Sequence, residues 1–201
     1  GNWALIVVAG AIGAAVGVVG AKRVKMTAMP QMVALFNGVG GGAAALVAFA
    51  EFHSLAPARG RIGGTEIVSI VLSALIGSIS FAGSLIAFAK LQELIGGRPI
   101  VFPGQNIVNG LIVAGAAAFG IAAIVGVQSQ WVIVGLILLA LTFGVMFVLP
   151  IGGADMPVVI SLLNAFTGLA AAATGFVLGN NVLIVAGALV GASGTLLTIL
   201  M

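Results

Sequence analysis

The chain has 201 residues, of which 62% are hydrophobic and only 5% are charged, and its formal net charge is +3. A soluble domain carries roughly 25% charged residues because its surface faces water, so this composition excludes a soluble globule and indicates that lipid surrounds most of the chain. The absence of Cys excludes a disulfide framework and thiolate chemistry, and the basic residues gather at the ends of apolar runs, a pattern of membrane topology rather than of nucleic-acid binding.

Seven apolar runs are long enough to cross about 30 Å of hydrocarbon, which takes roughly 20 helical residues. In chain order they lie near residues 3–20, 28–50, 66–89, 106–127, 131–149, 157–178 and 182–200. The links between them are too short for a separate soluble domain. The sequence therefore predicts an all-α, polytopic bundle of about seven spans. It would form a single transmembrane domain over residues 1–201, without a soluble domain in this chain.

The start of the first run has neither an initiator Met nor a basic segment. The run is also too long, and too rich in Gly at its end, to be the apolar region of a secretory signal with a cleavage site. We therefore expect Gly1 to be a cut or processed end of a longer protein.

Glycines recur in the first and last runs, where small residues would let helix backbones approach closely. They are Gly10, Gly13, Gly17 and Gly20 in the first run, and Gly187, Gly191 and Gly194 in the last. We expect both helices to pack tightly against neighbours at these positions.

The basic residues predict the orientation of the spans, because cytoplasmic loops carry an excess of Lys and Arg. The odd-numbered links carry five of them: Lys22, Arg23, Lys25, Lys90 and Arg98. The even-numbered links carry only Arg59 and Arg61. This difference places the odd-numbered links and the C-terminal Met201 in the cytoplasm (or a matrix), and Gly1 on the opposite side.

Two segments, residues 29–37 and 156–164, repeat one pattern: Pro follows Met, Leu lies five residues after the Pro, and Asn lies seven after it. Pro is tolerated in the first turn of a helix, and Thr27 or Asp155 just upstream could cap the exposed amides. Both helices would start on the cytoplasmic side and carry their Asn about 10 Å deep, at about 1.5 Å per residue. Chance similarity between apolar stretches is the alternative.

An amide in hydrocarbon is costly unless it is hydrogen-bonded, so we expect Asn37 and Asn164 to face the interior of the bundle. In one interpretation they join spans through interhelical hydrogen bonds. In the other they line a path for water or protons, because polar groups inside membranes often mark such paths. Asn does not itself carry a proton at physiological pH, so it would orient water rather than relay charge.

His53 and two serines are weaker candidates. Histidine is the residue best suited to exchange protons near neutral pH, but His53 lies at the outer end of the second span, where a solvated His is unremarkable. Ser80 and Ser84 lie four residues apart on one helical face. Because Ser in a helix usually bonds its own backbone one turn back, that interpretation is favoured for both.

The sequence offers no catalytic, metal-binding or cofactor-binding motif. The Gly-rich segment 38–43 superficially resembles a dinucleotide fingerprint, but it lies inside an apolar run, with no preceding strand and no acidic residue about 20 positions later. The last run has no Lys, which a seven-helix retinal protein would need for its Schiff base.

Four segments resemble the membrane domain (domain II) of the β subunit of proton-translocating NAD(P)+ transhydrogenase. They are Lys-Met-Thr-Ala-Met-Pro-Gln-Met-Val-Ala at 25–34, Phe-Ala-Gly-Ser-Leu-Ile-Ala-Phe-Ala-Lys-Leu at 81–91, Ile-Gly-Gly-Ala-Asp-Met-Pro-Val-Val-Ile-Ser at 151–161, and Leu-Ile-Val-Ala-Gly-Ala-Leu-Val-Gly-Ala-Ser-Gly at 183–194. The Gly-Gly-Ala-Asp-Met-Pro stretch and the Asn that follows are specific, and the resemblance covers essentially the whole chain.

This resemblance implies an enzyme that transfers a hydride between NAD(H) and NADP(H) and couples the transfer to proton passage through the membrane domain. Both nucleotides would bind in soluble domains, with the NADP(H) domain after the last span on the cytoplasmic side, so this chain alone would not transfer hydride. The implied partners are the transmembrane helices of the α subunit, the two soluble domains and lipid, in a dimer of complexes without nucleic acid. The implied location is the bacterial inner (cytoplasmic) membrane.

The resemblance also implies roles for individual residues. Three matching positions belong to the family's proton path: Ser84, Asn164 and Gly194. Asp155 falls in the loop that faces the NADP(H) domain. Some family members carry a His seven residues after the first Met-Pro proline, where this chain has Asn37. The proton-binding group could therefore be His53, a residue of the α subunit, or water held by Asn37 and Asn164.

Two other classes of function stay open at this point. The chain could be a stand-alone solute or ion carrier built on the parallel internal repeat, because such repeats occur in transporters. It could also be a purely structural anchor. A carrier would move its substrate without soluble domains, whereas in an anchor every polar substitution would change stability but not coupling.

Overall fold

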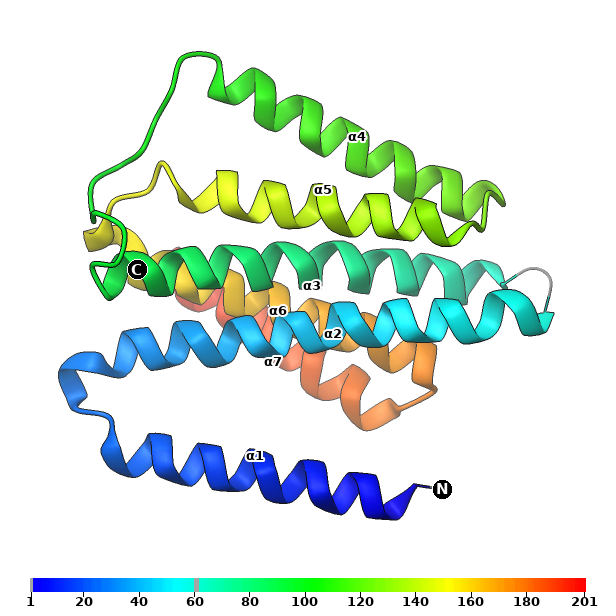
Figure 1. The fold of residues 1–201 in the computed structure, drawn as a ribbon, viewed down its shortest axis with the longest axis horizontal. Helices are drawn as coiled ribbons and strands as arrows, with labels where there is room; N and C mark the ends of the chain where they lie inside the picture. The colour runs from blue at the N-terminus through cyan, green and yellow to red at the C-terminus, as the bar shows by residue number, and fades with distance from the viewer. Residues whose placement is uncertain (1, 60–61) are drawn as a thin grey trace.

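The computed structural model describes residues 2–59 and 62–201, with the backbone only for residues 57–59. Within these residues seven α-helices are joined by short links, and no strand is present (Figure 1). The helices are α1 (Trp3–Arg23), α2 (Met29–Arg59), α3 (Gly64–Leu91), α4 (Gln105–Val125), α5 (Gln130–Val148), α6 (Met156–Leu178) and α7 (Asn181–Leu200). Each is long and apolar enough to cross a membrane, which confirms the predicted all-α class and the number of spans.

Helix α2 is longer than the apolar run that predicts it. The run ends near residue 50, but the helix continues to Arg59. Polar residues such as Glu51 and His53 lower the hydropathy without breaking the backbone hydrogen bonds of the helix. Hydropathy therefore reports how much of a helix suits hydrocarbon, and helix-ending residues determine where the helix stops.

Glycines with positive φ end two of the later helices, and an Asn caps the start of a third. Gly126, with φ of 127°, ends α4, and Gly179, with φ of 62°, ends α6 in the left-handed region that favours Gly. The next residue, Asn180, caps α7, because its side-chain oxygen accepts a hydrogen bond of 3.1 Å from the backbone N–H of Leu183.

Helix α3 lies at the centre of the bundle and contacts α2, α4, α5 and α6, while α6 also packs against α7 and α2. Two pairs of glycines bring neighbouring helices into backbone contact. A Cβ added at Gly77 would lie 2.6 Å from the carbonyl oxygen of Gly41, and one at Gly187 would lie 2.6 Å from that of Gly168. The close packing expected for the last helix is therefore confirmed.

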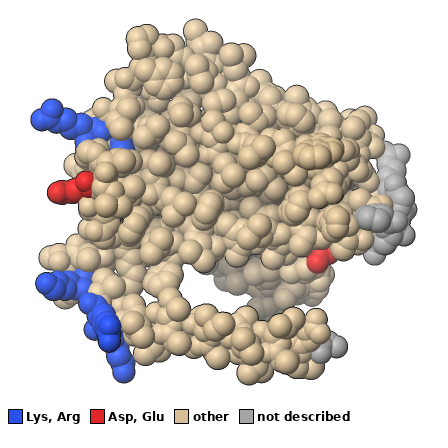
Figure 2. Space-filling model, in the orientation of Figure 1, with Lys and Arg blue, Asp and Glu red and all other residues tan. Residues whose placement is uncertain are grey.

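Helix α1 stands apart from the bundle (Figures 1 and 2). None of its residues is buried, and a Cβ added at Gly10, Gly13 or Gly17 would meet nothing within 4 Å. Only Gly20 faces a neighbour, the side chains of Met32 and Phe36 on α2. The expectation of tight packing at the other three α1 glycines is wrong for this chain by itself, because no neighbouring helix covers that face.

The links after α1, α3 and α5 and the C-terminus lie at one end of the bundle, and the other links lie at the opposite end (Figure 1). Basic side chains project from the first end (Figure 2). Four of the basic residues expected there are exposed: Lys22, Arg23, Lys25 and Arg98. The fifth, Lys90, is buried. Gly1, Arg61 and the side chain of Arg59, on which the predicted orientation also depends, lie outside the described residues.

Candidate functional site

Asn37 is a buried amide at the interface of α2 with α3, with 8% of its surface exposed. Its Nδ2 donates to the hydroxyl of Ser84 at 2.8 Å and, at 3.4 Å, to that of Ser80. Its carbonyl oxygen is buried and has no hydrogen-bond partner. The prediction that Asn37 faces the interior is confirmed, and the site keeps one unused acceptor in a place where such groups are normally paired.

Ser80 extends this contact to α6. Its hydroxyl donates to the backbone oxygen of Leu163 at 2.8 Å and lies 2.5 Å from the hydroxyl of Thr167. Thr167 can also donate to the Leu163 oxygen, at 3.1 Å. Asn37, Ser80, Ser84 and Thr167 thus form one amide–hydroxyl cluster that joins α2, α3 and α6.

A second hydroxyl pair lies nearer the other end of α3. Ser73 lies 2.6 Å from the hydroxyl of Thr174 on α6 and donates to the backbone oxygen of Ala44 at 3.2 Å. Seven residues separate Ser73 from Ser80, which is about 10 Å along a helix. The close contact between Gly77 and α2 fills this interval. The two groups of hydroxyls are therefore separate, and a direct hydroxyl-to-hydroxyl route does not connect them.

The expectation that Ser80 bonds its own backbone is wrong, because its hydroxyl bonds α6. Ser73 likewise bonds a neighbouring helix. Because α3 packs centrally and closely against its neighbours, backbone carbonyls of α2 and α6 lie within hydrogen-bond distance of its serine hydroxyls. Thr167 and Thr174 do make the bond to the carbonyl one turn back. The sequence interpretation missed both threonines, although their spacing of seven residues matches that of the two serines.

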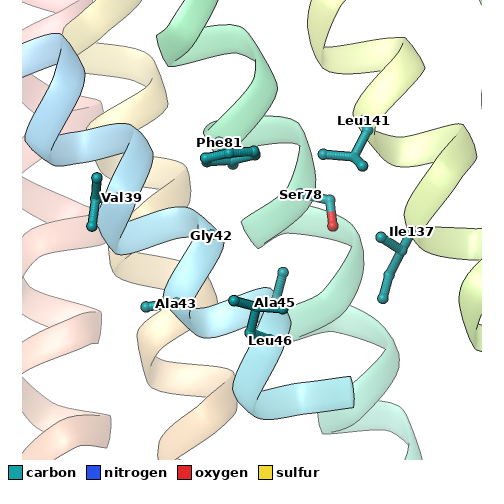
Figure 3. Close-up of a pocket in the computed structure, with 9 residues that line it drawn as sticks. All are labelled: Val39, Gly42, Ala43, Ala45, Leu46, Ser78, Phe81, Ile137 and Leu141. Carbon is teal, nitrogen blue, oxygen red and sulfur yellow. The ribbon is translucent and has the colours of Figure 1, made fainter. Parts of the chain in front are cut away.

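Ser78 lines an apolar cavity of about 380 Å³ between α2, α3 and α5 (Figure 3). Its hydroxyl is buried and has no partner, and the surrounding side chains are all apolar. A buried water needs about two to four polar partners, so this cavity is a poor route for water. The chemistry of the site stays with the amide–hydroxyl cluster.

Asn164 is exposed on α6, so the expectation that both amides turn inward is wrong for this residue within the chain alone. On the surface of a helix, position 164 is adjacent to positions three and four residues away. On one side, Thr167 meets Gly40 of α2. On the other, Gly168 packs against α7, and Ser161 donates to the Gly194 oxygen of α7 at 3.3 Å. Asn164 thus faces outward between α2 and α7.

The two Met-Pro segments also correspond in structure. A 3₁₀ turn precedes each helix, at Met26–Ala28 and Gly153–Asp155, and each Asn is the ninth helical residue. Four residues after each Asn, a Gly contacts a Gly of the next helix. Seven residues beyond that partner Gly stands Ser84 in α3 but Gly194 in α7. Asn37 therefore meets a hydroxyl, whereas Asn164 has a position without a side chain opposite it.

Comparison with known proteins shows the family of the chain. The family model described as NAD(P) transhydrogenase beta subunit matches residues 1–201. The chain belongs to this family. The NAD(P) transhydrogenase subunit beta of Rhodospirillum rubrum is 46% identical over 204 residues, covering 99% of this chain and 44% of the relative. A second sequence of the same name, from a particular strain of that species, has the same identity and coverage. The chain thus spans less than half the length of these relatives.

Two other predicted residues of this beta-subunit chain lie away from the cluster. His53 is exposed and lies sixteen residues beyond Asn37 on α2, about 24 Å along the helix. Asp155 is exposed at the opposite end, immediately before α6, and its side chain makes no capping hydrogen bond. The expectation that it caps α6 is therefore wrong, and its carboxylate projects from the surface that holds the odd-numbered links.

Gly194 has a packing role in this transhydrogenase family member. A Cβ at this position would lie 3.0 Å from the Cβ of Ala165 and 3.1 Å from its backbone nitrogen. Its carbonyl oxygen accepts hydrogen bonds from Ser161 at 3.3 Å and from Thr198 at 2.8 Å. The residue allows α6 and α7 to approach closely just beside Asn164.

Proposed function

We propose that this chain is the proton-conducting membrane portion of an NAD(P)+ transhydrogenase, which couples proton passage to hydride transfer between NAD(H) and NADP(H). Family membership supports this proposal, and so does the amide–hydroxyl cluster between three apolar helices. Hydride transfer itself belongs to soluble domains outside these residues. The Gly-rich segment 38–43 is a poor fit for a nucleotide, because a Cβ at Gly41 would already lie 2.9 Å from the oxygen of Gly77.

The observation that carries the proposal is the unpartnered carbonyl oxygen of Asn37. A buried acceptor left unpaired costs about 1–3 kcal/mol, and a water molecule that donates to it would remove this cost. The hydroxyls of Ser80 and Ser84 lie beside the same amide, so a water there would find the two to four polar partners that it needs. Such a water can pass a proton, which neither amide nor hydroxyl carries alone.

We infer that transmembrane helices of the α subunit cover the face between α2 and α7. An exposed amide such as Asn164 is costly in hydrocarbon, so a polar group on a partner helix is its natural complement. The neighbouring positions Gly40 and Ala43 of α2 are also exposed, and small residues permit close helix contact. No residue of α1 is buried, so α1 does not pack closely on this face, which leaves room for a further helix.

The remaining expectations follow from this arrangement and from the distribution of charge. The end that carries most of the basic residues would face the cytoplasm of a bacterium, with the bundle in its inner membrane. The C-terminus lies at that end (Figure 1), where an NADP(H)-binding domain would follow. Asp155 would contact that domain, and two such complexes would associate as a dimer.

The test replaces the two amides in the full complex, reconstituted in vesicles. We expect Asn37→Leu and Asn164→Ala each to lower proton pumping and reverse transhydrogenation together, by about tenfold or more. One hydrogen bond to a charged group contributes about 1.5–3 kcal/mol, and about 1.36 kcal/mol corresponds to a factor of ten in rate. Asn106→Ala, at an exposed amide of α4, is the matched control and should keep both activities. Full activity of both the Asn37 and the Asn164 variant would refute the proposed role and would leave the amides as structural contacts.

A further inference from the structure

Lys90 is a buried cation in the last turn of α3, with only 2% of its surface exposed. Its Nζ donates to the backbone oxygens of Leu149 and Ile151, at 2.5 and 2.6 Å. Both oxygens belong to the link that leaves the C-terminal end of α5. Carbonyls at that end of a helix lack helical partners and carry partial negative charge, so the ammonium group neutralises them and fixes their direction.

Backbone hydrogen bonds join the same link to the link between α3 and α4. The N–H of Ile100 donates to the Leu149 oxygen at 3.0 Å, and the N–H of Gly153 donates to the Gly97 oxygen at 2.8 Å. A recess of about 470 Å³ opens beside them, with Lys90, Glu93 and three glycines among its lining residues. The two links therefore form one connected layer over the end of the bundle, and Lys90 is the side chain that ties this layer to α3.

The tie connects two parts of the proposed mechanism. Ser84 precedes Lys90 by six residues on the same helix, and Asp155 follows Ile151 by four residues. A helix transmits displacement along its axis because its backbone hydrogen bonds make it stiff. Any movement of the segment 149–155 therefore pulls on the end of α3, and so on the hydroxyl that holds Asn37.

We propose that Lys90 is a positioning residue that links the segment 149–155 to the amide–hydroxyl cluster through α3. This inference rests on the proposed function, since it concerns how events at the surface near Asp155 reach the cluster. Lys90 itself stays bound to main-chain oxygens and exchanges no proton with the path. Its contribution is to hold the end of α3 at a fixed position relative to the segment 149–155.

The experiment uses the full complex in vesicles and three variants. Lys90→Met keeps the length of the side chain but removes every donor, and Lys90→Arg keeps donors and charge. Gln31→Met is the control, because the Gln31 amide donates to the Leu91 oxygen at the same end of the bundle rather than to an oxygen of the segment 149–155. We expect Lys90→Met to lower kcat for proton-coupled transhydrogenation by roughly fivefold or more with KM for NADPH unchanged. Lys90→Arg should recover at least roughly half of the rate, and Gln31→Met should stay within about twofold of the parent.

Hydrogen exchange supplies a readout that does not depend on transport. In Lys90→Met, the peptide covering residues 149–155 should exchange faster, while the distant link 126–130 should not change. If Lys90→Met keeps the parent kcat, the inference is overturned, whether or not hydrogen exchange in residues 149–155 changes. A raised KM with an unchanged kcat would also overturn it. If Lys90→Met fails to insert, Lys90→Leu, which likewise has no donor, decides by the same criteria. A parent complex that pumps no protons would instead refute the proposed function, and the exchange measurement would still test the tie.

Discussion

Gly77 offers a quantitative test of the packing at the centre of the bundle. In Gly77→Ala the new Cβ would lie 2.6 Å from the Gly41 oxygen and 3.0 Å from the backbone nitrogen of Ala45. Both are main-chain atoms, which cannot rotate away. Ordinary contact begins at 3.4 Å, so α2 and α3 must separate by about 0.8 Å. The 2.8 Å bond from Asn37 to Ser84 would then lengthen to about 3.6 Å, beyond hydrogen-bond range.

The expected effect on stability follows from this overlap. Overpacking typically costs about 1–3 kcal/mol, which for a chain of this size lowers the melting temperature by roughly 2–4 °C per kcal/mol. We expect Gly77→Ala to melt roughly 2–12 °C below the parent in thermal denaturation of the detergent-solubilised protein. Gly110→Ala is the matched control, because nothing lies within 4 Å of its Cβ position and Ala favours the helix. Equal melting of the two variants would show that α2 and α3 are not in backbone contact.

Two further pairs of substitutions test individual hydrogen bonds by the same melting measurement. Ser80→Ala should lower the free energy of unfolding by about 0.6–1.7 kcal/mol, because it removes hydrogen bonds between helices. Ser78→Ala should leave it unchanged, because the buried Ser78 hydroxyl has no partner. Equal losses of stability in the two variants would contradict the assignment of partners. Asn180→Ala should lower the free energy of unfolding by about 1 kcal/mol, because α7 loses its cap. Asn181→Ala leaves that cap intact and should lower it by less. A larger loss of stability in Asn181→Ala would contradict the capping geometry.

The number of helices could be predicted because the thickness of the bilayer imposes a length on each span. The repeated Met-Pro pattern likewise predicted that Asn37 and Asn164 stand at the same height in their helices. The length of α2 could not be predicted in this way. Beyond residue 50 its side chains no longer suit hydrocarbon, but the backbone hydrogen bonds of the helix form equally well in water. The end of an apolar run therefore does not have to be the end of the helix.

The candidate site was only partly accessible from sequence, because hydrogen-bond partners depend on which helices become neighbours. Ser80 bonds a carbonyl 83 residues further along the chain, and no local pattern contains that contact. The sequence places Lys90 only among the basic residues of the odd-numbered links, whereas in the structure it is buried and bonds oxygens at the end of α5. That contact follows from the packing of α3 against α5.

The unequal surroundings of the two amides follow from the packing of the two repeats. In both, contact between glycines sets the spacing of a helix pair, and an Asn stands one turn from the contact. Ser84 supplies a hydroxyl to Asn37 in the first repeat. The second repeat cannot supply one at Gly194, because even a Cβ there would press on Ala165 at 3.0 Å. Because α6 and α7 pack this closely, a hydrogen-bond partner for Asn164 has to come from outside the chain. The hydrogen bonds of Asn37 are fixed by the fold of this chain. The hydrogen bonds of Asn164 would instead be made with a partner subunit, so they would change when that subunit moves. Of the two positions, Asn164 is therefore the one at which a change in the surrounding complex would reach the proposed proton path first.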